Sequence, residues 1–239
     1  MAPQNKVTLA SVAELQSEPF VQLLDRLNAV SRLYGLREMT NWSKVWEYPW
    51  VLLNGVEGVV RPGVKICDIG SEISSVPWYL ASKGADVTII EMDSQYVSLW
   101  DDIRRRTGWN VRWSIVDSET LPFESELFSV VTSFSVIEHQ RNKEKAISEV
   151  VRVLKPDGIF GISFDICEPA MGMTFPEWNG KAITMKDFES LLWNHRAFRM
   201  DELSSPNWNV QDIGDFIRWH RGSAAHHNYT VGAAILHRR

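Results

Sequence analysis

The feature of this chain that most constrains its fold is an apolar run, residues 64–69, followed by a glycine. The run reads Val-Lys-Ile-Cys-Asp-Ile and meets Gly70, which is typical of a buried parallel strand that enters a tight turn. A second run, residues 86–91, closes at Glu91, 21 residues after Gly70. Such a βαβ unit suits a nucleoside, because the glycine turn admits the ligand and the second acid accepts hydrogen bonds from ribose hydroxyls.

Strand-like and helix-like segments alternate along most of the chain, and this alternation predicts a parallel sheet with right-handed crossovers. The predicted strands are residues 64–69, 86–91, 111–116, 128–134, 159–165, about 197–203 and 229–236. The predicted helices are residues 11–35, 75–83, 94–107, 142–154, 185–194 and about 211–220, with short helices within 40–60.

Composition excludes several classes of protein. The net charge of −5 and the lack of a long basic run argue against nucleic-acid binding, and the cluster at residues 104–106 is expected to be a solvated helix face. No apolar stretch approaches the ~20 residues that span a bilayer, and residues 1–6 lack a signal-peptide core, so a cytoplasmic protein is expected. Cys67 and Cys167 are expected to be buried thiols, and no spacing suggests a metal site.

Several motifs occur in an order that resembles the class I S-adenosylmethionine-dependent methyltransferases, of the type that acts on small molecules. They are residues 67–71 (Cys-Asp-Ile-Gly-Ser), Glu91, residues 116–123, residues 133–139 and residues 149–158. The resemblance implies a Rossmann-like, doubly wound α/β fold. Its seven-stranded sheet would be mostly parallel, with the last strand antiparallel and helices on both faces.

The resemblance also implies a cofactor, S-adenosyl-L-methionine, and residues that bind it. Glu91 matches the acid that binds the ribose, and Asp117 matches the acid that binds the adenine amino group. The candidate cofactor-binding residues are Asp68, Gly70, Ser71, Glu72, Glu91, Met92, Asp117, Ser118 and Ser133. The usual later glycines are replaced by Glu72 and Ser74, so Glu72 either pairs with the cofactor's ammonium group or weakens cofactor binding.

Two regions are predicted by this resemblance: a helical lid and substrate-binding region, 1–60, and a cofactor-binding α/β domain, 61–239, with an inserted loop at about 168–183. Aromatic side chains in the lid and the inserted loop suit a flat or cationic acceptor, while core packing is the alternative for each of them. The candidate substrate-binding residues are Trp42, Trp46, Tyr48, Trp178 and His226.

Methyl transfer from a sulfonium is an in-line displacement, and a base is needed only when the acceptor must lose a proton. His139 is the candidate catalytic base because it follows the strand at 128–134, at the edge where such sheets bind ligands. The alternative is that His139 caps a helix or packs against the cofactor pocket. Glu138 is expected to be structural and to bond backbone near the first loop.

The sequence therefore predicts a methyltransferase that acts on a small molecule such as a natural product, a sugar or an amine, as a monomer or homodimer. The methylated atom, whether oxygen, nitrogen or carbon, is left open. One alternative is a non-catalytic binding protein that keeps the fold, which the altered glycine motif favours. The other is a nicotinamide-dependent oxidoreductase, which would need glycines where Glu72 and Ser74 stand.

Overall fold

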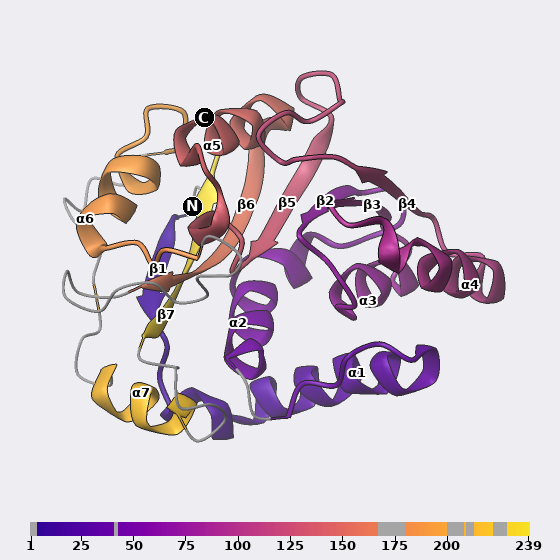
Figure 1. The fold of residues 1–239 in the computed structure, drawn as a ribbon, viewed down its shortest axis with the longest axis horizontal. Coiled ribbons are helices and arrows are strands. Elements are labelled where there is room, and N and C mark those ends of the chain that lie inside the picture. Colours follow the sequence, from indigo (N-terminus) through magenta and orange to yellow (C-terminus); the bar gives the residue numbers. More distant parts are fainter. Residues whose placement is uncertain (1–3, 41–42, 167–179, 200–207, 209–212, 222–228) are drawn as a thin grey trace.

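The computed structural model describes residues 4–40, 43–166, 180–199, 208, 213–221 and 229–239. Its centre is a seven-stranded sheet with the strand order β1-β7-β6-β5-β2-β3-β4 (Figure 1). The strands are β1 (Lys6–Leu9), β2 (Lys65–Ile69), β3 (Asp86–Glu91), β4 (Val111–Ile115), β5 (Phe128–Phe134), β6 (Leu154–Ile166) and β7 (Thr230–His237).

Strands β2 to β6 run parallel to one another, while β7 is antiparallel to both β6 and β1. The carboxyl ends of the five parallel strands therefore lie along one edge of the sheet, where open α/β sheets bind their ligands. Because β7 runs the other way, its first residue, Thr230, lies at the same edge, opposite Ile166. The predicted mostly parallel, seven-stranded fold with an antiparallel last strand is confirmed.

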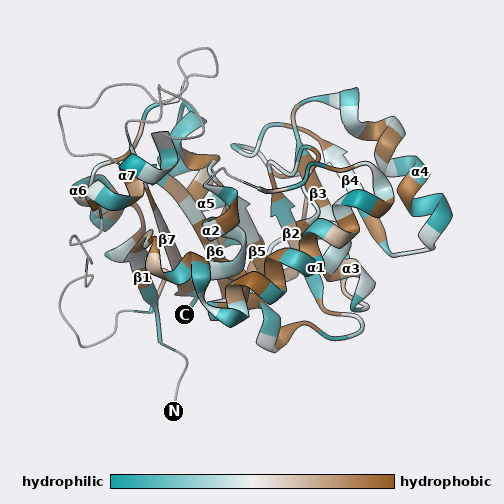
Figure 2. Ribbon diagram, turned by 90° about the horizontal axis from the view of Figure 1, so that it is seen from below, coloured by the Kyte–Doolittle hydropathy of each residue, from teal (hydrophilic) through white to brown (hydrophobic). Residues whose placement is uncertain are grey.

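Helices cover both faces of this sheet, as side-chain alternation along β2 shows. Ile66 packs in one apolar core with residues of α1, α2, α3, α4 and α7, whereas Cys67 packs in a second core with residues of α5 and α6. Figure 2 shows apolar and polar residues sharing the surface of α1, as expected for a helix that covers a core. The helices are α1 (Glu18–Tyr34), α2 (Lys44–Val51), α3 (Val76–Ser82), α4 (Val97–Thr107), α5 (Lys143–Val153), α6 (Met185–Phe188) and α7 (Ile213–Arg221).

Strand β1 is the element that sequence reasoning missed. It occupies the edge of the sheet beside β7, and the Asn5 side-chain oxygen just before it accepts the His237 backbone N–H at 2.8 Å. The strand predicted near 197–203 lies partly outside the described residues, and Phe198 forms only an isolated bridge to Arg238. The segment 1–60 thus contributes a strand to the sheet as well as helices, and its role as a lid stays a prediction.

Helix α2 is buried along its whole length, although it contains Lys44 and Glu47. It lies between α1 and the sheet, in contact with β6 and β7. Its position brings two charged side chains into the protein interior near the carboxyl edge of the sheet. Among the described residues, no helix is both long and apolar enough to cross a bilayer.

Candidate functional site

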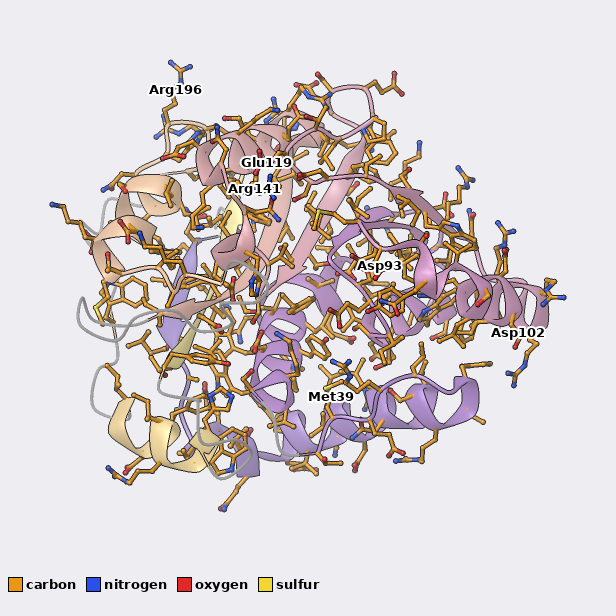
Figure 3. All side chains as sticks on the ribbon, viewed as in Figure 1. Met39, Asp93, Asp102, Glu119, Arg141 and Arg196 are labelled. Carbon is orange, nitrogen blue, oxygen red and sulfur yellow. The ribbon has the colours of Figure 1, made fainter. Side chains whose placement is uncertain are left out.

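A cavity of about 550 Å³ lies along the carboxyl edge of the sheet, within the size range of small-ligand sites. Segments that follow β2, β3, β4 and β5 line it, together with Asp165 near the end of β6, α2, the loop before α2 and the residue before β7. Figure 3 shows Asp93 beyond the end of β3, and Glu119 and Arg141 close together near α5; all three line the cavity. Asp102, on α4, and Arg196 lie at the periphery of the molecule, away from it.

The turn after β2 lines one half of the cavity, the half that lies near β2, β3 and β4. Gly70 has φ +74°, and a Cβ atom at this position would overlap the side chain of Val136. The buried Asp68 carboxylate fixes the turn by accepting hydrogen bonds from the hydroxyls of Ser71, in the turn, and Thr132, in β5. Burial raises the pKa of Asp68 to about 6, although both hydroxyls favour its charged form.

Glu72 adopts a backbone conformation that usually belongs to glycine, with φ 45°. Its N–H donates to the Glu91 carboxylate at 3.0 Å, and its carbonyl accepts the indole N–H of Trp100 at 3.0 Å. Its side chain lies 3.6 Å from the Arg37 guanidinium. The turn therefore keeps its shape without the later glycines, and the Glu72 side chain adds a carboxylate to the cavity wall.

The Glu91 carboxylate joins the turns after β2 and β3. One oxygen accepts the Glu72 N–H, and the other accepts the Met92 N–H at 2.8 Å. Burial raises the pKa of Glu91, and these backbone hydrogen bonds oppose that shift. A carboxylate fixed in this way at a cavity wall suits the paired hydroxyls of a ribose.

Asp117 follows β4 on an exposed loop and lines the same half of the cavity, and it accepts the Glu119 N–H at 2.8 Å. Helix α5 anchors the remainder of this loop. Glu149 accepts the Leu121 N–H at 2.7 Å, and Arg152 donates to the Leu121 carbonyl at 2.9 Å. The loop is thus fixed where it meets the cavity.

Three candidate cofactor residues do not line this cavity. Asp68 acts through Ser71, while Ser118 and Ser133 are buried and face α5, beside Ala146. The other candidates do line it, and they are Gly70, Ser71, Glu72, Glu91, Met92 and Asp117. Together they fit a nucleoside that carries an amino acid, because they combine a cradle that a Cβ would fill with three carboxylates at separate strand ends.

The other half of the cavity, near β5–β7, has aromatic walls. Tyr48 packs edge-on against Phe134, with ring centroids 4.7 Å apart, and burial raises the pKa of Tyr48 to about 12. Met39 and Tyr229 also line this half. Trp46 does not: it is fully buried, its indole N–H donates to Glu14 at 2.6 Å, and it packs in the core.

Three further candidates, Trp42, Trp178 and His226, lie outside the described residues. His139 lines the cavity, half-buried at the end of a single 3₁₀ turn after β5, Ile137–His139. Its backbone N–H donates to the Val136 carbonyl at 2.9 Å. Glu138 accepts the Asp165 backbone N–H at 3.0 Å, so its backbone partner lies on β6 and not near the first loop.

Sequence reasoning missed a group of buried charges beside this half of the cavity. The Lys44 ammonium and the Glu47 carboxylate form an ion pair at 2.8 Å, and their side chains are 7% and 0% exposed. Asp165 and Glu138 are buried close by, and burial raises the pKa of Glu138 to about 7. Charged residues on a short helix resemble a solvated face, so only the three-dimensional contacts identify them as interior.

Comparisons with known proteins point to methyltransferases. Residues 67–162 match the family model described as "Methyltransferase domain". The ubiquinone/menaquinone biosynthesis C-methyltransferase UbiE of Stutzerimonas stutzeri (strain A1501) is 25% identical over 213 residues, which cover 82% of this chain and 78% of that protein.

Two solved structures share the fold. The cyclase SpnF superposes with a TM-score of 0.61 at 18% identity and covers 92% of both chains. A geranyl diphosphate methyltransferase, solved with GPP and sinefungin, gives a TM-score of 0.57 at 12% identity, covering 76% of this chain and 74% of its own. These two likenesses concern the fold alone.

Proposed function

Because the chain belongs to the class I S-adenosylmethionine-dependent methyltransferases, we propose that it methylates a small molecule bound in the β5–β7 half of its cavity. Its cofactor is S-adenosylmethionine. One observation carries the proposal: a single cavity has a glycine turn and Glu91 in one half, and His139 with aromatic walls in the other.

The dimensions of the cavity support a small acceptor. Its volume of about 550 Å³ must hold both the cofactor and the group that is methylated, which suits a compact molecule better than a polymer. The names of two similar proteins also point to small molecules, since one is a C-methyltransferase of quinone biosynthesis and the other is a geranyl diphosphate methyltransferase.

In this proposal the β2–β4 half binds the cofactor. Glu91 accepts hydrogen bonds from both ribose hydroxyls, and Asp117 accepts one from the adenine amino group. Glu72 faces the ammonium of the amino acid part. Asp68 acts indirectly, because it holds Ser71 and does not line the cavity. The support for these roles is their position at the ends of three neighbouring strands, around a turn that excludes a side chain.

His139 is proposed as the base that removes the acceptor's proton. When bound, the cofactor supplies a methyl group on a sulfonium, whose departure leaves a neutral thioether and needs no acid. The protein's part is to hold the acceptor in line, exclude water and accept the proton. His139 suits this last task because an imidazole can take up a proton near neutral pH, and its half-buried ring lies at the cavity wall.

Replacement of His139 by alanine tests this role. We expect turnover, measured with a radiolabelled methyl group, to fall by ~10²–10⁴-fold, while S-adenosylhomocysteine binds as tightly as in wild type by calorimetry. His195, which lies outside the cavity, provides the control variant His195→Ala, which should retain activity. A stable His139→Ala protein with full activity would refute the role of base. Loss of stability and cofactor binding together would assign His139 a structural role.

A non-catalytic protein with this fold is the alternative, and the altered glycine motif is its support. The described geometry weakens that support, since Glu72 adopts the required backbone conformation and leaves the turn intact. Binding of S-adenosylmethionine without any methyl transfer to a broad acceptor panel would favour the alternative.

A further inference from the structure

We propose that the Lys44 ammonium binds the acidic oxygen of the acceptor, so that the acceptor is a phenol or an enol. The inference rests on the proposed methyl transfer and narrows its substrate class. Lys44 lines the β5–β7 half of the cavity, and its ammonium lies 3.5 Å from the carbonyl of Phe134, the last residue of β5.

Lys44 is fixed in place by Glu47. The ammonium donates to one Glu47 oxygen at 2.8 Å, and the same oxygen accepts the hydroxyls of Ser135 at 2.7 Å and Ser163 at 2.5 Å. Ser135 adopts a left-handed backbone conformation, with φ 53°, as it leaves β5. Strained backbone of this kind concentrates at functional sites, and here it directs a side chain towards the carboxylate that holds Lys44.

Stability does not explain why this pair is buried. Transfer of two charges from water into a protein interior costs several kcal/mol per ion, and well-packed apolar residues often stabilise a fold equally well. The Lys44–Glu47 pair is almost completely removed from solvent, yet Lys44 is one of the residues that line the cavity. Such an arrangement is expected where a charge must meet a ligand in a water-poor site.

The cation remains charged in its buried position. Burial alone would lower the pKa of Lys44, but the attraction of Glu47, with a smaller contribution from Asp165, holds this pKa above its usual range. Lys44 is therefore a permanent positive charge at neutral pH and not a proton acceptor. A protonated amine in this half of the cavity would meet a like charge, whereas an oxygen that becomes anionic would be stabilised.

The neighbouring side chains favour a flat, initially neutral acceptor. Met39, Tyr48 and Phe134 provide apolar and aromatic walls, which suit a ring. Glu47 and Asp165, the second of which also lines the cavity, place negative charge near Lys44, which disfavours an acceptor that is always anionic. A phenol or enol enters neutral and develops its negative charge only as its proton leaves.

Methyl transfer to a phenol or an enol begins with the loss of the acceptor's proton. The O–H proton of the acceptor passes to the His139 imidazole, and the oxygen becomes an anion beside the Lys44 ammonium. An electron pair of this anion, on oxygen or on the conjugated carbon, forms the new bond to the methyl carbon. The electrons of the broken carbon–sulfur bond stay on sulfur, and Lys44 keeps its protons throughout.

The test uses 4-nitrophenol, whose anion absorbs visible light, and 1,3-cyclohexanedione as an enol. With S-adenosylhomocysteine bound, the wild-type protein should lower the pKa of bound nitrophenol, seen as anion absorbance at a pH where the free phenol is neutral. The Lys44→Met variant should lose this shift and bind either probe at least ~10-fold more weakly. Benzylamine should bind no better to wild type than to the variant.

Glu47→Gln provides a second variant if Lys44→Met does not fold, because it keeps the ammonium but removes the carboxylate that holds it. It should reduce the absorbance shift in the same direction. Lys83→Met is the matched control, since Lys83 pairs with Glu57 away from the cavity, and it should leave the shift unchanged.

Three results would overturn the proposal: nitrophenol that binds wild type without a pKa shift, neither probe bound at millimolar concentration, or a shift that survives in Lys44→Met. Calorimetry with S-adenosylhomocysteine separates this proposal from the proposed function. Cofactor binding that persists in every variant, together with a failed acceptor test, would reject the acceptor class alone.

Discussion

Replacement of Glu91 by alanine should weaken cofactor binding strongly while the protein stays folded. This carboxylate joins two turns, because its oxygens accept the N–H groups of Glu72 and Met92 at 3.0 and 2.8 Å. The substitution removes these two bonds and also the acceptor proposed for the ribose hydroxyls. Both turns lie at the edge of the sheet, so water can satisfy the freed N–H groups.

The loss of cofactor affinity in Glu91→Ala follows from the hydrogen bonds that the carboxylate would make. A hydrogen bond to a charged acceptor contributes about 1.5–3 kcal/mol, which corresponds to roughly 10- to 100-fold in affinity. The ribose offers two hydroxyls to one carboxylate, so the upper part of this range applies. Glu91→Gln should fall between wild type and alanine, because an amide keeps one acceptor oxygen and replaces the other with a donor.

Isothermal titration calorimetry with S-adenosylhomocysteine measures this loss, and urea unfolding measures the stability of the same protein. Asp86 provides the control, since it begins the strand that Glu91 ends, and its side chain accepts a hydrogen bond from the exposed Asn110 side chain. Asp86→Ala should leave the dissociation constant unchanged. A folded Glu91→Ala protein with wild-type affinity would refute the role of this carboxylate.

Two further predictions concern the turn after β2. Burial raises the pKa of Asp68 to about 6, whereas the same carboxyl group has a pKa near 4 in the unfolded protein. The protonated Asp68 therefore stabilises the fold fully below pH 4, and this stabilisation is lost as the pH rises through 6. Urea unfolding should therefore show Asp68→Asn gaining ~3 kcal/mol relative to wild type between pH 4 and pH 7, and a difference that stays constant with pH would contradict this. Gly70→Ala should abolish cofactor binding, because the added Cβ would overlap the Val136 side chain. The control Gly63→Ala has φ +80° and no neighbouring atom, so it should bind the cofactor normally and lower the free energy of unfolding by only ~1–2 kcal/mol through left-handed strain. Equal calorimetric affinities of these two glycine variants for S-adenosylhomocysteine would contradict the role of the overlap with Val136.

The sequence predicts the central strands well because their signals are local. β3 and β5 have the boundaries expected from sequence, since each is a short apolar run bounded by polar residues. The acids at strand ends follow from the same reasoning, because parallel strands bring their carboxyl ends to one edge. Glu91 and Asp117 therefore reach the predicted cavity.

The remaining features depend on contacts between residues far apart in the chain. β1 has four residues with one fully buried side chain, so it carries almost no periodic signal of its own. The role of Glu47 depends on Ser163, which lies more than a hundred residues further along the chain. Trp46 and Tyr48 are two residues apart on one helix, yet one packs in the core and the other lines the cavity. Composition cannot separate such neighbours, because helix orientation decides which side chain meets the ligand.

The pairing of β1 with β7 has a consequence for how this protein is made. The ribosome synthesises Lys6–Leu9 long before their partner strand, Thr230–His237. Until β7 emerges from the ribosome, β1 has no strand to pair with, although β2 to β5 can already pair beside one another. This edge of the sheet is therefore completed only by a contact between two strands that lie far apart in the chain. Such long-range closure is slow, so this edge should be the last part of the nascent protein to gain protection from hydrogen exchange.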